Sequence, residues 1–200
     1  AHITDVQSLT QLVPSLNVQS RGNVIQPTIR GVGTAANTVG NEPNVAVYID
    51  GAYQPISVGN SFRFFDIERV EVLRGPQGTL FGRNATGGLL NFITRDPSTD
   101  AYHGTFAASY SRFNRVDLDG YITGPISDSL AFGVTSYYTR SDGYLDNPNK
   151  PGDHVAENKS TGVRGKLLFA PNEDVTIKLI ADYVYLDDPT PVSPSIAADS

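Results

Sequence analysis

Five segments in the second half of the chain alternate between apolar and polar residues, and this pattern constrains the fold more than any other feature. In the first segment, Phe106, Ala108 and Tyr110 alternate with Thr105 and Ser109. Successive side chains of a β-strand point to opposite faces, so each segment predicts a strand with one apolar and one polar face. The five predicted strands cover residues 102–111, 115–123, 130–139, 163–169 and 175–183.

The length of these strands and their connections favour a transmembrane β-barrel. A strand that crosses the hydrocarbon core needs about 9–11 residues, and aromatic residues near the segment ends match the interfacial girdles of barrels. Residues 124–128 and 170–174 predict tight turns, whereas residues 141–159 form a long polar loop. Short turns on one side and long loops on the other are typical of outer-membrane barrels. A soluble β-sandwich, whose strands also alternate, is the alternative.

The same alternation predicts which side chains face lipid. The side chains expected to contact hydrocarbon are Val116, Leu118, Leu130, Val134, Leu167 and Leu179. The charged side chains expected on the inner, polar face are Asp117, Asp119, Arg164, Lys166 and Lys178. Placing charges inside and apolar groups outside is what a strand surrounded by lipid requires.

The composition excludes several classes of protein. The 200 residues are 39% hydrophobic and 18% charged with 19 Gly and 13 Pro, too apolar for a disordered chain and too rich in turn formers for a helical bundle. No segment approaches the roughly 18 consecutive apolar residues of a membrane helix. The net charge of −6 falls on residues 100–200, because residues 1–99 carry seven Arg, no Lys and seven acidic residues. An acidic chain without a basic patch argues against a nucleic-acid partner.

The first half of the chain predicts a compact α+β unit. A short helix is expected to begin after Asp5, which is a suitable N-cap, and to end at Pro14. The loops 31–44 and 51–64 are long for a small domain. Long loops on a rigid scaffold commonly carry function. Short strands are predicted at 28–30, 45–50, 67–73 and 88–94.

No set of residues points to catalysis or to a bound cofactor. Residues 31–36 match a dinucleotide-binding pattern, but the sequence after them cannot supply the helix that binds the pyrophosphate. His2, His103 and His154 are not spaced as zinc ligands, and no Ser-His-Asp constellation can be proposed. The sequence therefore predicts neither an enzyme nor a metal or cofactor site. Whether the acidic loop 141–159 binds a cation stays open.

One run in the first half closely resembles the plug signature of TonB-dependent outer-membrane receptors. Over residues 67–94 it reads IERVEVLRGPQGTLFGRNATGGLLNFIT. Upstream, IRG at residues 29–31 and VYIDG at residues 47–51 match that family in order and spacing. The resemblance is strong over residues 5–98 and only architectural over residues 100–200.

The resemblance implies an α+β plug domain over residues 1–99, followed over residues 100–200 by the first five antiparallel strands of a transmembrane β-barrel. In this family, a barrel of about 22 strands encloses the plug. Five strands leave two open edges, which cannot persist in lipid. We therefore expect the chain to be an internal, N-terminally truncated piece of a longer protein, without its signal peptide and without the box that TonB binds.

The resemblance further implies a receptor of the bacterial outer membrane. Its partner TonB would supply energy for active uptake of a scarce nutrient, and a ferric siderophore or another iron chelate is the commonest cargo of the family. Cobalamin and oligosaccharides are also carried by members, so the sequence leaves the substrate open. A passive outer-membrane porin and a soluble β-rich carbohydrate-binding module are the alternative functions.

Two arginines are candidates for docking the plug in the barrel. Arg30 and Arg74, each followed by a glycine, match plug arginines that in the family meet barrel glutamates, which would lie beyond Ser200. Arginine suits a plug that must stay docked yet be displaceable, because it pairs bidentately with carboxylates while hydration keeps the net energy modest. Ordinary surface arginines are the alternative interpretation.

The loops 34–42 and 52–60 are candidates for ligand capture. They offer hydrogen-bonding groups and an aromatic face on a rigid support, and by resemblance such plug loops face the external vestibule. The alternative is that these residues merely fill the barrel lumen. The candidate ligand-facing residues are Asn37, Asn41, Tyr53 and Gln54.

Overall fold

The chain divides into two compact units, Ala1–Asp96 and Pro97–Ser200. The structure, a computed structural model, describes residues 10, 13–21, 24–33, 43–54, 66–78, 85–143, 145–146, 154–155 and 157–187. Each unit has its own sheet and its own pattern of burial. Among the described residues, no helix is long and apolar enough to cross a membrane.

The first unit begins its described part with an antiparallel hairpin of β1 (Leu16–Arg21) and β2 (Val24–Ile29). Leu16 and Val18 are buried and Asn17 between them is exposed, so buried and exposed side chains alternate over only a few residues of β1. The sequence predicted only a strand at residues 28–30, so the hairpin was not expected. The predicted helix after Asp5 falls almost entirely outside the described residues, although Thr10 is helical.

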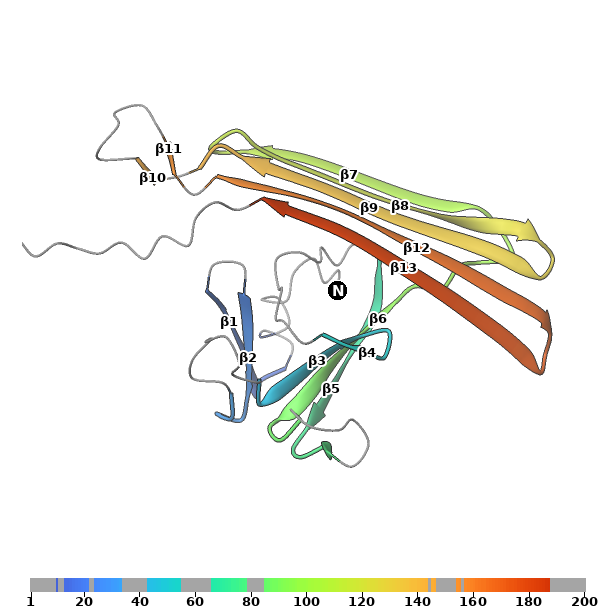
Figure 1. The fold of residues 1–200 in the computed structure, drawn as a ribbon, viewed down its shortest axis with the longest axis horizontal. Helices are drawn as coiled ribbons and strands as arrows, with labels where there is room; N and C mark the ends of the chain where they lie inside the picture. Colours follow the sequence, from blue (N-terminus) through green and yellow to red (C-terminus); the bar gives the residue numbers. More distant parts are fainter. Residues whose placement is uncertain are drawn as a thin grey trace, which may run out of the picture. The chain divides into compact units, whose positions relative to one another are not determined.

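A four-stranded sheet forms the body of the first unit (Figure 1). Its order is β4 (Ala52–Tyr53), β3 (Val45–Ile49), β6 (Gly88–Thr94) and β5 (Ile67–Arg74). β3 runs parallel to β6, and the other two pairings are antiparallel. One face packs on the β1–β2 hairpin to form an apolar core, whose buried members are Leu16, Val18, Ile29, Val45, Ile49, Leu90 and Phe92.

Asp50 ties the ends of the two parallel strands together. It follows β3 in the left-handed region, with φ of 49°, and Gly51 continues the turn with φ of 80°. The Asp50 carboxylate accepts hydrogen bonds from Thr94 N at 2.8 Å and from Thr94 Oγ1 at 2.7 Å. Its backbone N–H donates to the Phe92 carbonyl at 2.9 Å. The Asp-Gly pair of the VYIDG run therefore both turns the chain and fixes β3 against β6.

The second unit is a five-stranded antiparallel sheet in which sequence neighbours pair (Figure 1). Long strands are consistent with the alternating segments predicted for this half. The strands are β7 (His103–Ser111), β8 (Arg115–Ser127), β9 (Leu130–Ser141), β12 (Asn158–Asn172) and β13 (Val175–Asp187). Between β9 and β12 a separate two-residue pairing joins β10 (Leu145–Asp146) and β11 (His154–Val155).

The two faces of this sheet differ in the way that the sequence predicts. Register places Leu118 opposite Ala108 and Tyr138, whereas Asp117 lies opposite Ser109 and Thr139. Of the predicted lipid-facing residues, Leu118, Val134, Leu167 and Leu179 are exposed, and Val116 and Leu130 are partly exposed. Of the predicted inner residues, Asp117, Asp119 and Lys166 are buried, Arg164 is half-buried and Lys178 is exposed.

The strands run further than predicted at their turns. β8 continues through Pro125 to Ser127, and the turn itself is only residues 128–129. β12 likewise continues through Pro171 before a turn at residues 173–174. Both pairings have a register shift at these prolines, because proline cannot donate a ladder hydrogen bond and is accommodated at bulges. The predicted tight connections are thus real, but each is shorter than its turn-forming sequence suggests.

Candidate functional site

Arg30 lies in the turn that follows β2, and its side chain is exposed. Its φ of 53° is left-handed, and Gly31 follows with φ of 80°. The Arg30 N–H donates to the Ser15 carbonyl at 2.9 Å, and Ile29 pairs with Val32 through an isolated bridge. These bonds fix the backbone of the turn, so the exposed guanidinium is carried by a well-defined support.

Arg74 ends β5 and is also exposed. It pairs with Gly88 of β6, where a Cβ atom would lie 2.4 Å from the Leu73 carbonyl oxygen. Gly88 therefore allows a close approach of the two strands that no other residue would permit. Within the part of the chain that the structure describes, neither Arg30 nor Arg74 takes part in an ion pair. Their proposed barrel partners stay a prediction.

Tyr53 and Gln54 are held in place by strand pairing, side-chain packing and hydrogen bonds. Tyr53 belongs to β4 and lies opposite Tyr48, with ring centroids 5.5 Å apart and planes inclined by 54°. It packs against the apolar cluster that contains Tyr48. Gln54 donates through its side chain to the Ala52 carbonyl at 3.2 Å and through its backbone to the Val47 carbonyl at 2.8 Å. Both side chains keep some exposed surface, so ligand contact is compatible with these bonds.

The other predicted ligand-facing residues, Asn37 and Asn41, lie outside the described residues, as do residues 55–65 of the second loop. Most of the acidic loop 141–159 is also outside, so its cation binding is untested. Among the residues that are described, no group of three His, Asp or Glu side chains is arranged to hold a metal ion.

Glu71 is the centre of a small polar group on β5 and β6 that sequence reasoning missed. Its carboxylate accepts from Arg69 Nε at 3.0 Å and from Asn91 Nδ2 at 3.1 Å. Arg69 also donates to Glu68 at 2.9 Å. The hydrogen bond from Arg69, and after it the one from Asn91, lowers the pKa of Glu71 below its usual range. Arg69 and Glu71 lie two residues apart on one strand face, which is the signal that could have identified the pair.

Asp117 is the centre of a second polar group, on the buried face of the five-stranded sheet. It accepts from Arg115 Nε at 2.9 Å, from Thr139 Oγ1 at 2.8 Å and from Ser109 Oγ at 3.3 Å. These partners come from three adjacent strands, because Ser109, Asp117 and Thr139 are in register. A carboxylate removed from water is held in this way by charge-assisted hydrogen bonds.

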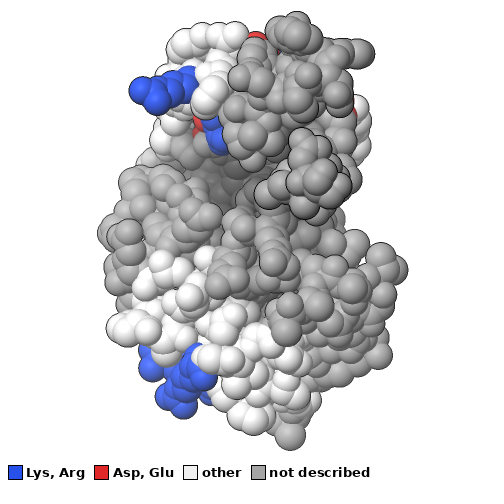
Figure 2. Space-filling model, turned by 90° about the vertical axis from the view of Figure 1, so that its left-hand side faces the viewer, with Lys and Arg blue, Asp and Glu red and all other residues white. Residues whose placement is uncertain are grey.

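On the face shown in Figure 2, some Lys and Arg side chains of the described residues lie at the surface. Isolated exposed ion pairs contribute only about 0–1 kcal/mol each. Ion pairs between described residues include Arg69–Glu68, Arg69–Glu71, Arg115–Asp117, Arg140–Asp142 and Arg164–Asp182.

Comparison with known proteins identifies relatives for both units. The family described as TonB-dependent Receptor Plug Domain matches residues 1–89. The pesticin receptor of Yersinia pestis is 33% identical over 176 residues, which cover 86% of this chain and 26% of the receptor. The iron-regulated outer membrane virulence protein of Vibrio cholerae is 30% identical over 155 residues, covering 69% of this chain and 22% of that protein.

A solved structure supports the same relationship. The crystal structure of the ferric yersiniabactin uptake receptor from Yersinia pestis superposes with a TM-score of 0.79 and 29% identity, covering 92% of this chain and 29% of that one. The chain spans about a quarter of the length of the curated relatives it matches. The plug match and the similarity across both units lead to one conclusion: the chain belongs to the TonB-dependent receptors and comprises plug sequence followed by strands of the receptor barrel.

Proposed function

We propose that the protein to which this chain belongs is a bacterial outer-membrane receptor that takes up a ferric siderophore or another iron chelate with energy supplied by TonB. The observation that carries the proposal is the similarity across 86% of the chain to the pesticin receptor. The ferric yersiniabactin uptake receptor, one of the similar solved structures, suggests iron chelates as the ligand class. No catalytic step is part of the proposal.

The burial pattern of the second unit supports a membrane location. Side chains exposed on one face include Phe106, Ile122, Leu179 and Tyr183, at 49–72% of their full accessibility. The opposite face buries Asp117, Asp119 and Thr139. A large exposed apolar face on a water-soluble protein would be an aggregation liability, whereas lipid solvates it. This arrangement disfavours the soluble carbohydrate-binding module.

We further propose that residues 1–99 act as the plug and residues 100–200 as the first five strands of the barrel. Arg30 and Arg74 then dock the plug on barrel carboxylates that this chain does not contain. Their exposure and their rigid glycine-containing turns support this role. Asn37, Asn41, Tyr53 and Gln54 are proposed to face the ligand, supported for Tyr53 and Gln54 by their partial exposure beside a long loop.

Uptake of radioactive iron by cells tests the proposed function. Cells that lack other siderophore receptors would express the full-length gene and receive ferric yersiniabactin or ferric enterobactin. We expect accumulation that stops when TonB is deleted or a protonophore is added. Accumulation that persists without energy would identify the passive porin instead. Recovery of the protein outside the outer-membrane fraction would contradict the membrane location.

A further inference from the structure

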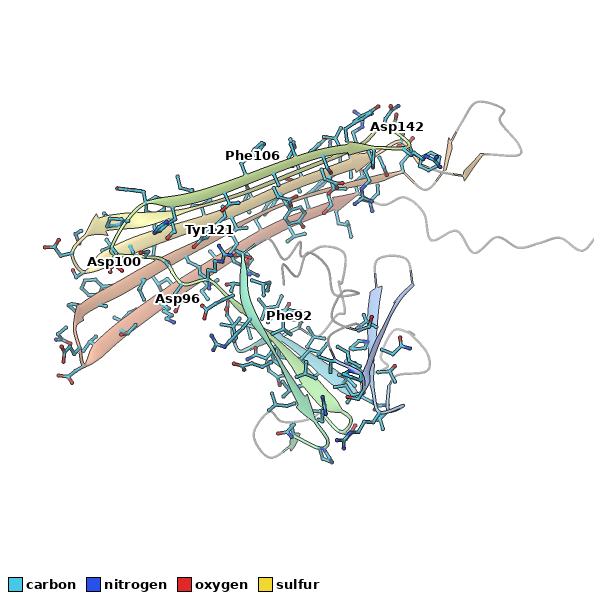
Figure 3. All side chains as sticks on the ribbon, turned by 180° about the vertical axis from the view of Figure 1, so that it is seen from behind. Phe92, Asp96, Asp100, Phe106, Tyr121 and Asp142 are labelled. Atoms are coloured by element: carbon cyan, nitrogen blue, oxygen red, sulfur yellow. The ribbon has the colours of Figure 1, made fainter. Side chains whose placement is uncertain are left out.

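The segment between β6 and β7 is bound to β8 from both faces of the second sheet. This segment, residues 95–102, is called the linker below, because it carries the chain from the first unit to the second. All of its residues are described, and none belongs to a helix or strand. Figure 3 labels Asp96 and Asp100 within it. Its contacts define where the chain first becomes attached to the second sheet.

On the buried face of that sheet, the linker is bound through Thr123. The Ser98 N–H donates to Thr123 Oγ1 at 3.1 Å, and the Thr123 hydroxyl donates to the Phe132 carbonyl of β9 at 2.7 Å. Thr123 is 3% exposed, and its hydroxyl uses its one proton and an acceptor lone pair. Pro97 lies over Gly133, where an added Cβ atom would be 3.5 Å from Pro97 Cγ. The linker is therefore bonded to β8 and, through Thr123, to β9.

On the opposite face, the linker ends with a tyrosine that covers a glycine. Gly124 follows Thr123 in β8, so the two residues face opposite sides of the sheet. A Cβ atom added at Gly124 would overlap the Tyr102 ring. The Tyr102 hydroxyl donates to the Pro125 carbonyl at 2.8 Å, and its ring centroid lies 6.3 Å from that of Phe132. Two linker residues, one on each face, thus hold β8 between them.

The other end of the linker is bonded within the first unit. Thr94, the last residue of β6, donates to Asp50, and the Arg95 N–H donates to the Asp66 carbonyl at 2.8 Å. Between the attached N–H groups of Arg95 and Ser98 the chain has only residues 95–97, three in all. Without the contacts to β8, the next attachment would be the start of β7, and the stretch would be residues 95–102, eight in all.

We propose that Thr123 and Gly124 form a clasp that shortens the tether between plug and barrel and so keeps the plug docked. This inference rests on the proposed function, in which the first unit is the plug and the second begins the barrel. A tethered domain docks at an effective concentration that falls roughly as the −3/2 power of tether length. Release of the clasp would lengthen the tether from three to eight residues and lower that concentration about fourfold.

A threonine pair in the full-length receptor tests the buried side of the clasp. Thr123→Val removes the hydroxyl at nearly constant volume, so the Ser98 N–H loses its acceptor. Thr161→Val is the matched control. The Thr161 hydroxyl also donates to a carbonyl of a neighbouring strand, that of Tyr137 at 3.1 Å. It lies on β12, which pairs with β9 and β13, so its loss should leave the linker in place.

A glycine pair tests the outer side of the clasp independently. Gly124→Ala places a methyl group where the Tyr102 ring lies and should displace that ring. Gly120→Ala is the matched control, because it is on the same face of the same strand. A Cβ atom added at Gly120 meets nothing nearer than Ser136 Oγ, at 3.5 Å, which is an ordinary contact. The two test variants act on opposite faces of β8, so either one decides the matter if the other fails to reach the membrane folded.

Three measurements are made on each variant at equal amounts of folded receptor. These are hydrogen exchange of the linker amides in purified receptor, entry of vancomycin into cells, and uptake of ferric yersiniabactin. Thr123→Val and Gly124→Ala should exchange faster at the linker and admit vancomycin about fourfold faster, because the undocked fraction rises as the effective concentration falls. Both controls should match wild type.

Two results would overturn the clasp. One is wild-type exchange at the linker in both test variants, and the other is faster exchange with unchanged entry of vancomycin. Failure of the proposed function is seen separately. If the wild-type receptor accumulates no iron chelate, uptake of such chelates is rejected, while linker exchange and vancomycin entry still decide whether the clasp keeps the plug docked.

Discussion

The two sheets of this chain bury opposite kinds of side chain. In the first unit the central strand β6 is apolar and almost wholly buried, and Leu89, Leu90 and Phe92 are at most 1% exposed. In the second unit the buried face is mainly polar, with Asp117 and Thr139 inside, and the large apolar side chains are on the outer face. Strands of the same geometry therefore have opposite burial patterns in the two units.

This difference shows that burial alone does not define a core. In water, apolar groups gain about 25 cal/mol for each Å² removed from solvent. In lipid, packing one apolar group against another brings no such gain, and polar groups must point to the inner face, where they meet their partners. The first unit therefore has the pattern of a water-soluble domain, and the second has the pattern of a domain solvated by lipid on one face.

Truncation of a buried side chain in the first unit should produce the largest loss of stability, and the same kind of truncation on the outer face of the second unit should produce a much smaller one. Phe92→Ala removes a 1% exposed ring from the apolar core and should destabilise the plug by about 3–5 kcal/mol. Leu179→Ala, on the exposed face of β13, should cost well under half as much because it leaves no cavity. Hydrogen exchange of β6 and β13 in the full-length receptor measures both. Equal costs would break the contrast between the two sheets.

A charge on the outer face of the second unit should produce the next largest effect. Val134 lies opposite Ile122 and Gly165 in the middle of the sheet, so Val134→Arg should cost about 2–4 kcal/mol in a membrane. Leu118 lies opposite Tyr138, nearer the aromatic end, and Leu118→Arg should cost less. Thr105→Arg on the polar face is the control. Folding titrations into lipid vesicles measure all three, and an equal cost for Thr105→Arg would reject the assignment of faces.

Loss of the docking arginines should produce a moderate effect. Replacing Arg30 and Arg74 together by Ala would leave their proposed barrel carboxylates without partners, at roughly 1–3 kcal/mol for each unsatisfied group. We expect faster hydrogen exchange throughout the plug and greater antibiotic leakage through the full-length receptor. Arg69→Ala is a suitable control, because its partners Glu68 and Glu71 lie on its own strand. Unchanged hydrogen exchange in the double variant would indicate that both residues are ordinary surface arginines.

The alternation of the second half was sufficient to predict its strands and faces, because a period of two assigns every side chain to a face. Strand ends were less predictable. Pro125 and Pro171 carry strong turn signals, yet the strands continue through both residues by shifting register. Sequence chemistry locates a turn, whereas the neighbouring strand decides where pairing stops.

Contacts between distant residues were beyond sequence reasoning. The hydrogen bond from Asn114 Nδ2 to Asp142 Oδ2 depends on strand lengths that bring two connections to one end of the sheet. The β1–β2 hairpin was missed because its alternation is short and Pro27 lies within it. Arg30 and Arg74 were singled out through the resemblance and the glycine that follows each, and their docking role stays a prediction.

Substitution of the candidate ligand-facing residues should lower affinity without altering the fold. Gln54→Ala removes one contact to the Ala52 carbonyl and leaves the backbone bond to Val47 intact. We expect severalfold weaker binding of ferric yersiniabactin or ferric enterobactin by purified receptor, at an unchanged amount of folded protein in the outer membrane. Tyr53→Ala tests the aromatic face, and Tyr53→Phe separates the hydroxyl from the ring that packs on Tyr48. Equal affinities in all variants would support lumen filling instead.

The smallest effect should come from Glu71, and it should appear only in acid. Because Arg69 and Asn91 lower the pKa of Glu71 in the folded plug, the ionised carboxylate favours folding at a pH above the ordinary glutamate pKa of 4.5. That contribution is lost as the pH falls from there through the lowered folded pKa. Glu71→Gln should therefore reduce the loss of plug stability in acid. Hydrogen exchange of β5 and β6 between about pH 5.5 and 3 measures this loss. Glu68→Gln, which removes a neighbouring carboxylate that bonds to Arg69 and not to Asn91, is the control. The same acid limb in wild type and Glu71→Gln would show that this exposed group adds nothing to the stability of the plug sheet.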